Sequence, residues 1–190
     1  TAQISFHGML EALQEECWRE TPAGRMPKVR FGQIAVKDAK FRTFIADAAA
    51  RRDFYMHIYD VTYGLLHPGS DSLVVIDDSI VRGTTSLRIV RLLKAAGAKE
   101  VHVRIASPKM THPCFYGVDT STCDQLIGHR CSVEEICRQI EADSLAFLSE
   151  GALLRAGNRK EMCMACFTGR YPTALYEHAA EIGRKEDKNR

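Results

Sequence analysis

The chain has 190 residues, of which 45% are hydrophobic and 26% are charged, and its formal net charge is +2. This composition is typical of one soluble globular domain and argues against a disordered or membrane-spanning chain. The charge is nearly balanced, no basic stripe with interleaved aromatic residues is present, and no basic-then-apolar leader precedes the domain. We therefore expect a cytoplasmic protein with neither nucleic acid nor a membrane as its partner.

The first elements predicted along the chain are an amphipathic helix and two strands. Residues 4–19 repeat their apolar side chains at helical spacing. Residues 28–43 are basic and have a weak strand pattern. Residues 54–63 are aromatic and β-branched, as in a strand, and the Pro68–Gly69 pair predicts a turn after them.

A βαβ unit is predicted in the middle of the chain. Residues 73–76 form a continuous apolar run, which is typical of a strand covered on both faces. A helix capped by Thr84 or Thr85 then runs to about Ala96, and residues 101–106 form the next strand. This order predicts a parallel sheet with a crossover helix.

Helix and strand alternate again in the last third. Ser132 and Glu135 have the spacing of a capping box, which predicts a helix that begins there. Residues 143–148 read as a strand and residues 150–157 as a short helix.

The stretch V-V-I-D-D-S-I-V-R-G-T-T-S, residues 74–86, is the main candidate for a binding site. Asp77 and Asp78 follow a predicted parallel strand, where ligands of open α/β sheets bind. The loop of residues 79–85 leads into a helix N-terminus, whose N–H groups and dipole favour a phosphate. Since two carboxylates repel a phosphate, they indicate that the ligand also carries sugar hydroxyls or Mg²⁺. A turn that merely caps the helix is the less favoured alternative.

These residues closely resemble the phosphoribosylpyrophosphate (PRPP) signature of type I phosphoribosyltransferases. The segments A-A-G-A-K-E-V-H-V-R-I-A-S-P, H-P-C-F-Y-G-V-D-T-S-T, F-R-T-F-I and C-M-A-C-F-T-G-R-Y-P-T are similar to the phosphoribosyltransferase half of the amidophosphoribosyltransferase family. The resemblance implies the type I phosphoribosyltransferase fold, an α/β fold with a mostly parallel central sheet flanked by helices. It also implies a glycosyltransferase that makes 5-phosphoribosylamine from PRPP and glutamine or ammonia, the first step of de novo purine synthesis.

The resemblance assigns roles to single residues. The acids that match Asp77 and Asp78 hold the ribose hydroxyls and Mg²⁺, and the loop after them holds the 5′-phosphate. Arg42 matches a mobile loop that closes over PRPP, where it would stabilise the leaving pyrophosphate, although a plain surface arginine is the alternative. Thr1 would be the last hydroxyl of a pyrophosphate loop and a candidate Mg²⁺ ligand. The predicted PRPP-binding set is Asp77, Asp78, Ser79, Val81, Arg82, Gly83, Thr84 and Thr85.

Seven cysteines are many for such a chain, and their odd number fits poorly with a closed set of disulfides. The Cys163-x-x-Cys166 pair could be a buried turn, half of a zinc site or part of an iron–sulfur cluster. The resemblance implies a four-iron, four-sulfide (4Fe-4S) cluster held by Cys114, Cys163 and Cys166. Its fourth ligand would lie upstream or be replaced by Cys17; otherwise the thiols would be free or hold zinc. The remaining cysteines read as small apolar residues: Cys123, Cys131 and Cys137.

The resemblance also implies partners. These are purine nucleotides as feedback inhibitors, the glutaminase domain of a parent chain, and further copies in a homo-oligomer. We expect residues 1–183 to form one domain, shortened on its N-terminal side, and residues 184–190 to form a charged tail. Nothing here matches the glutaminase domain, so an inactive isolated chain is also consistent with the resemblance.

Other functions stay open at this point. One is a non-catalytic regulatory module of the same fold that binds PRPP or purine nucleotides. An iron–sulfur electron carrier ranks below these, because it has no need of the two acids and the loop after them. A thioredoxin-like redox site at Cys163-x-x-Cys166 is weaker still, because this pair does not open a helix after an early strand.

Overall fold

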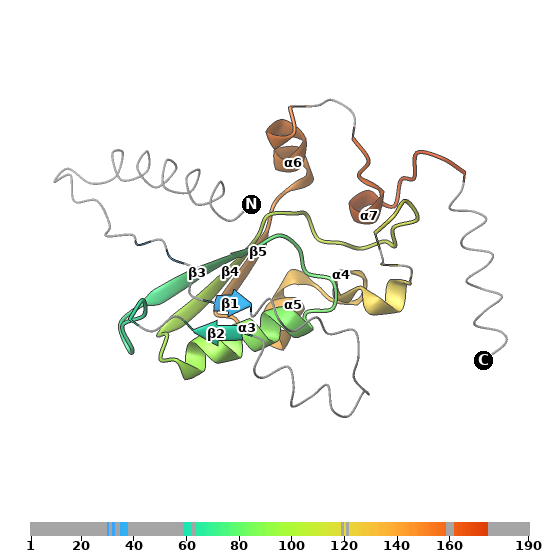
Figure 1. The fold of residues 1–190 in the computed structure, drawn as a ribbon. Coiled ribbons are helices and arrows are strands. Elements are labelled where there is room, and N and C mark those ends of the chain that lie inside the picture. The colour runs from blue at the N-terminus through green and yellow to red at the C-terminus, as the bar shows by residue number, and fades with distance from the viewer. Residues whose placement is uncertain are drawn as a thin grey trace.

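The computed structural model describes residues 30, 32, 35–37, 59–61, 64–118, 120, 122–158 and 162–174. Within them, a parallel sheet in the order β3–β4–β5 has helices packed against it, and a short antiparallel pair, β1–β2, forms a second sheet (Figure 1). The strands are β1 (Ala35–Lys37), β2 (Tyr59–Val61), β3 (Ser72–Asp77), β4 (Glu100–Ile105) and β5 (Ser144–Phe147). The helices are α3 (Thr84–Ala95), η2 (Cys123–Gln125), α4 (Ile127–Arg130), α5 (Val133–Gln139), α6 (Glu150–Ala156) and α7 (Ala165–Thr168).

The predicted βαβ unit is confirmed. β3 and β4 are parallel and in register, with Val75 opposite Val103, and α3 connects them. β5 extends the sheet on the other side of β4, with Val103 opposite Leu145. The α/β class with a parallel sheet therefore follows directly from the strand pairing.

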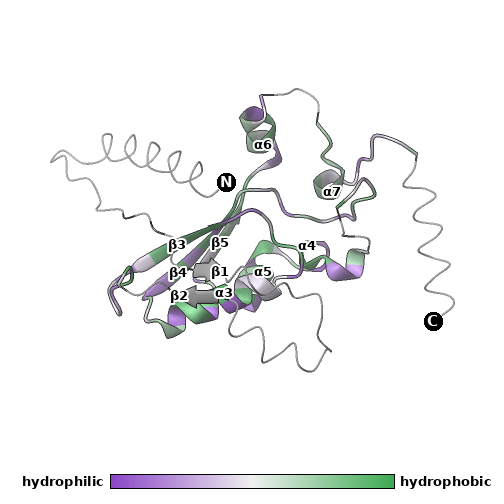
Figure 2. Cartoon of the chain, in the orientation of Figure 1, coloured by the Kyte–Doolittle hydropathy of each residue, from purple (hydrophilic) through white to green (hydrophobic). Residues whose placement is uncertain are grey.

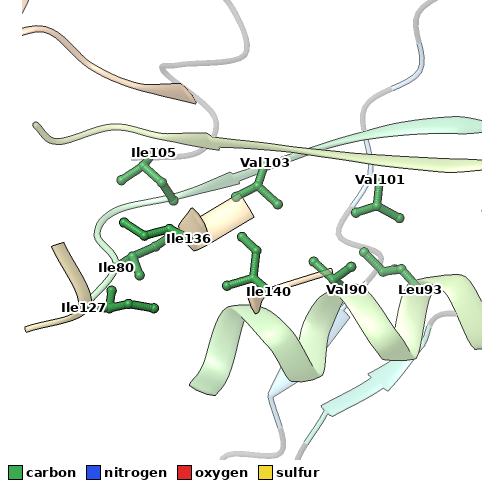
Figure 3. Close-up of a cluster of buried hydrophobic side chains, with 9 residues drawn as sticks. All are labelled: Ile80, Val90, Leu93, Val101, Val103, Ile105, Ile127, Ile136 and Ile140. Atoms are coloured by element: carbon green, nitrogen blue, oxygen red, sulfur yellow. The ribbon is translucent and has the colours of Figure 1, made fainter. Parts of the chain in front are cut away.

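The core lies between the sheet and the helices α3 and α5 (Figure 3). Side chains of β4 alternate between the core and the opposite face, so that Val101, Val103 and Ile105 are all 3% exposed or less. Burying one such side chain fully contributes about 1.5–3 kcal/mol, so this layer supplies much of the stability of the sheet. The cluster comprises Ile80, Val90, Leu93, Val101, Val103, Ile105, Ile127, Ile136 and Ile140.

The prediction that β3 is covered on both faces is wrong for Val74, which is 44% exposed. Exposure alternates over the first four residues of β3, because the described core helices pack against one face of the sheet. Figure 2 shows hydrophobic and hydrophilic residues alternating along α3, as expected of a helix with one buried face.

The start of α3 also differs from the prediction. Neither Thr84 nor Thr85 caps it; Gly83 occupies the N-cap position, without any side-chain cap, and Thr84 is already the first helical residue. At the other end the prediction holds, since Gly97 follows the helix at φ 101 and donates its N–H to the Lys94 carbonyl at 3.0 Å.

The predicted capping box is confirmed at the start of α5. The Glu135 amide donates to Ser132 Oγ at 3.2 Å, and the Ser132 amide donates to Glu135 Oε2 at 2.7 Å. The strand and helix predicted at residues 143–148 and 150–157 are confirmed as β5 and α6.

Several predictions fall outside the described residues. These are the helix at residues 4–19, the tail at 184–190 and the sites at Thr1, Cys17 and Arg42. The domain limits therefore stay a prediction. No helix in the described part of the chain has the length and apolarity needed to cross a membrane.

Candidate functional site

The two adjacent acids lie where β3 ends. Asp77 is the last residue of β3 and pairs with Ile105 of the parallel strand β4. The Ala106 amide donates to the Asp77 carbonyl at 2.9 Å, which extends the ladder to the final residue of the strand. The structure thus places both acids and the loop after them at the carboxyl edge of a parallel sheet, the usual position of a ligand site.

The two carboxyls differ in environment. Asp77 is partly buried and accepts the Asp78 amide on Oδ1 at 2.9 Å, whereas Asp78 is exposed and accepts the Ser79 hydroxyl at 3.3 Å. Burial raises the pKa of the Asp77 carboxyl above its ordinary value, and the negative charge of Asp78 raises it further against the opposing hydrogen bond. Because the pKa of Asp77 is higher in the folded state than in the unfolded state, ionisation of this carboxyl destabilises the fold. The free energy of unfolding therefore falls as the pH rises from the unfolded-state pKa through the folded-state pKa. A hydroxyl donor or a cation at this point would offset that cost.

The loop after the acids presents a row of backbone donors. Within the part of the chain that the structure describes, the amide N–H groups of residues 79–86 meet no protein acceptor. The first helical amide to donate is that of Leu87, to the Gly83 carbonyl at 2.9 Å. Thr84 and Thr85, exposed beside this row, add hydroxyl groups. Such a concentration of unpaired donors at a helix N-terminus favours an anion with several oxygens.

Glycine is required at the end of this loop. Gly83 has φ 77, and a Cβ atom there would lie 3.0 Å from Ile127 Cδ1. Any other residue would be strained in the left-handed region and would crowd the core.

A distant segment contacts the same loop. The Ile127 amide donates to the Val81 carbonyl at 2.8 Å, and the Arg82 guanidinium donates to the Gln125 side-chain oxygen. Gln125 lies 43 positions from Arg82 in the sequence, and no local pattern predicts that it or Ile127 contacts the loop.

The turn with the Cys-x-x-Cys pair lies close to Cys114. The amides of Thr111 and His112 donate to the Cys166 carbonyl at 2.9 and 3.0 Å. Burial raises the pKa of the Cys166 thiol, and the neighbouring Cys114 and Cys163 raise it further, so three sulfur atoms share one region. The Tyr116 amide donates to Cys114 Sγ at 3.5 Å.

The described residues contain no group of three or more His, Cys, Asp or Glu side chains that could hold a metal ion, so the iron–sulfur ligand set that the resemblance implies stays a prediction.

The other described cysteines have local roles. Cys137 donates its thiol to the Ala142 carbonyl at 3.2 Å, and Cys131 accepts from Gln139 at 3.2 Å. Both are partly buried, consistent with small apolar residues. Burial, and then the neighbouring Cys123, Cys114 and Cys166, raise the pKa of Tyr171 to about 12.

Sequence comparison finds relatives called amidophosphoribosyltransferase. An amidophosphoribosyltransferase of Bacillus subtilis is 49% identical over 143 residues, which are 72% of this chain and 30% of the relative. One of Synechocystis is 62% identical over 105 residues, 54% of this chain and 21% of the relative. A chloroplastic one of Arabidopsis thaliana is 52% identical over 145 residues, 75% of this chain and 25% of the relative. No protein-family model matches the chain.

Two solved structures that are similar to this chain have descriptions consistent with the names of these relatives. A glutamine PRPP amidotransferase of B. subtilis, complexed with ADP and GMP, superposes with a TM-score of 0.65 at 47% identity. The match covers 75% of this chain and 32% of that one. A structure described as the allosteric regulatory enzyme of purine biosynthesis has a TM-score of 0.66 at 46% identity, with 76% and 32% covered. The chain thus spans about a third or less of the length of the relatives it matches.

Replacing Gly83 should cost more than backbone strain alone. We expect Gly83→Ala to lower the free energy of unfolding by about 2–4 kcal/mol, because left-handed strain and crowding against Ile127 add. Urea denaturation measures the loss. Gly69→Ala is the matched control, since Gly69 has φ 75 and no atom within 4 Å of an added Cβ. Equal losses for the two variants would contradict the assigned contact.

Proposed function

The chain is related by sequence and by fold to the phosphoribosyltransferase part of the amidophosphoribosyltransferases, and we propose that it serves the synthesis of 5-phosphoribosylamine from PRPP. In this reaction ammonia from glutamine replaces pyrophosphate, as the first step of purine biosynthesis. The observation that carries the proposal is the row of amides at residues 79–86, directly after two acids, that meet no acceptor in the part of the chain that the structure describes. PRPP carries a phosphate, a diol and a pyrophosphate, and this arrangement complements the first two.

The loop and the acids divide the ligand between them. The amides of residues 79–86 and the hydroxyls of Thr84 and Thr85 would donate to the 5′-phosphate. Asp77 and Asp78 would accept from the ribose hydroxyls. A hydroxyl that donates to Asp77 would offset the desolvation that raises the pKa of this partly buried carboxyl.

Mg²⁺ fits the donor set. Its protein ligands are commonly one or two carboxylates, with water and substrate phosphates completing the octahedron. Asp77 and Asp78 would supply the carboxylates, and Thr1 remains a further candidate outside the described residues. The ion would neutralise charge on the leaving pyrophosphate.

The residues of the chain would then assist the displacement in two ways. The bond between ribose C1 and the pyrophosphate oxygen breaks while the ammonia nitrogen bonds to C1. The loop would bind the 5′-phosphate and the two acids would bind the ribose hydroxyls, so C1 would be held in place for this attack. Arg42, which lies outside the described residues, would stabilise the pyrophosphate, and closure of its loop would exclude water.

Purine nucleotides are proposed as competing ligands. AMP and GMP carry the same 5′-phosphate and ribose diol, so the loop and acids that suit PRPP also suit them. The structure of the B. subtilis relative in complex with ADP and GMP supports this proposal.

The cysteines are proposed to hold a 4Fe-4S cluster through Cys114, Cys163 and Cys166. The cluster would supply a stable crosslink between the segment of Cys114 and the turn of Cys163 and Cys166. The fourth ligand stays open; Cys17, the predicted substitute, lies outside the described residues.

The regulatory-module alternative is not favoured, because the relatives and structural neighbours named above are enzymes. A glutaminase domain of the parent chain and a homo-oligomer remain proposals. A cytoplasmic location also remains a proposal, since relatives of both bacteria and chloroplasts match.

Neutralising the two acids should abolish binding without unfolding the chain. We expect Asp77→Asn with Asp78→Asn to remove Mg²⁺-dependent PRPP binding in titration calorimetry, because the diol and the cation lose their acceptors. Thermal stability should not fall, since a partly buried charge is removed. The control is Glu134→Gln with Glu150→Gln, which removes the same charge from exposed positions on α5 and α6. Unchanged PRPP affinity in the Asp variant would refute the proposal.

AMP and GMP should displace PRPP from the wild-type chain. In calorimetric competition, the apparent Kd for PRPP should rise in proportion to the nucleotide concentration. Saturation by both ligands at the same time would show separate sites instead.

Iron binding should depend on the cysteines of the proposed cluster. After anaerobic incubation with ferrous iron and sulfide, we expect the wild type to retain about four irons and four sulfides per chain. Cys166→Ser should lose both, whereas Cys137→Ser, whose thiol contacts only a backbone carbonyl, should retain them. Stoichiometric zinc without sulfide would exclude the cluster.

A further inference from the structure

The loop of residues 79–85 packs against a segment that no sequence motif identifies. This segment comprises η2 and α4, residues 123–130, and it contacts the loop through both backbone and side chains. Ile127 supplies the amide that donates to the Val81 carbonyl at 2.8 Å, and its side chain lies beneath Gly83 and beside Ile80 (Figure 3). Gln125 accepts a hydrogen bond from Arg82.

The η2–α4 segment is itself held firmly. A Cβ atom on Gly128 would lie 2.3 Å from the Met110 carbonyl oxygen, so α4 is in direct backbone contact with the segment after β4. The His129 ring nitrogen Nδ1 lies 2.8 Å from the Thr111 carbonyl oxygen. A contact from this segment to the loop is therefore made from a fixed position.

Arg82 is the one cationic side chain of the loop, and it is exposed. A guanidinium has five N–H donors in a rigid plane, which match phosphate oxygens. Among the described residues, Gln125 is the partner found for this guanidinium, so further donors remain for a ligand. A free arginine would lose considerable rotamer entropy on binding, and an anchored one would lose less.

We propose that Gln125 is a positioning residue for phosphate binding, which acts by holding the Arg82 guanidinium beside the loop. The proposal rests on the proposed function, because it assigns the phosphate of the same ligand to that loop. Gln125 does not touch the ligand; its side-chain oxygen orients the cation that does.

Calorimetry with the full chain tests this role, with ribose 5-phosphate and PRPP as ligands. We expect Gln125→Ala to weaken both by roughly 3- to 10-fold, the size of effect expected for one ordinary hydrogen bond, because Gln125 acts through Arg82 and does not touch the ligand. The matched control is Gln139→Ala, whose amide contacts Cys131 and not the loop; its affinities should not change.

A double-mutant cycle separates positioning from general support of the fold. In an Arg82→Ala background, Gln125→Ala should have no further effect on affinity, because its partner is already absent. Equal effects in both backgrounds would overturn the proposal. A fall in Tm that accounts for the weaker binding would do the same.

The wild-type titration distinguishes the two levels of inference. If the wild type binds both ligands and Gln125→Ala binds them equally well, the positioning role fails and the proposed function stands. If the wild type binds neither ribose 5-phosphate nor PRPP, the proposed function fails and this inference with it.

Discussion

The parallel pairing of β3 with β4 is the constraint on which the rest of the site depends. It ends β3 at Asp77, so the two acids and the next backbone amides emerge together at one edge of the sheet. The core on one face of β4 holds that edge in place, and α3 begins only after the loop has turned. The end of β3 therefore determines where the two acids, the backbone amides of the loop and the N-terminus of α3 lie.

The site departs from what stability alone would select. It combines a partly buried carboxylate beside a second one, amides that meet no acceptor among the described residues, and a glycine in a left-handed conformation that other residues adopt only with strain. The partly buried carboxylate costs free energy in the unliganded chain. No other described helix begins with this combination of features. A ligand that satisfies them would explain their concentration in one turn, and this is the physical basis for proposing phosphate and diol recognition there.

Much of this could be predicted from local sequence. The βαβ order, the Asp77–Asp78 pair at a strand end and the Ser132–Glu135 capping box each depend on neighbours within a few residues, and all are found. The cap of α3 was wrongly assigned to threonine, because hydroxyl residues usually favour that position, whereas here close packing on Ile127 requires Gly83. The burial of β3 was overestimated at Val74, since an apolar run does not reveal which face of a sheet the helices cover. The contact of Gln125 with Arg82 depends on how β4 and the segment after it pack, and the periodicity of apolar residues in the sequence does not predict this packing.

The long separation between the loop and its support has a kinetic consequence. Arg82 and Gln125 lie 43 positions apart, and β4 lies between them. Closing so large a loop is entropically costly, so such contacts form late unless they belong to the nucleus. β3 and α3 can pack with β4 before residues 123–130 reach them. The loop between β3 and α3 then lacks its contacts with Gln125 and Ile127. Affinity for anions would accordingly emerge in the final stage of folding, and a chain arrested before that stage would have its sheet without its recognition properties.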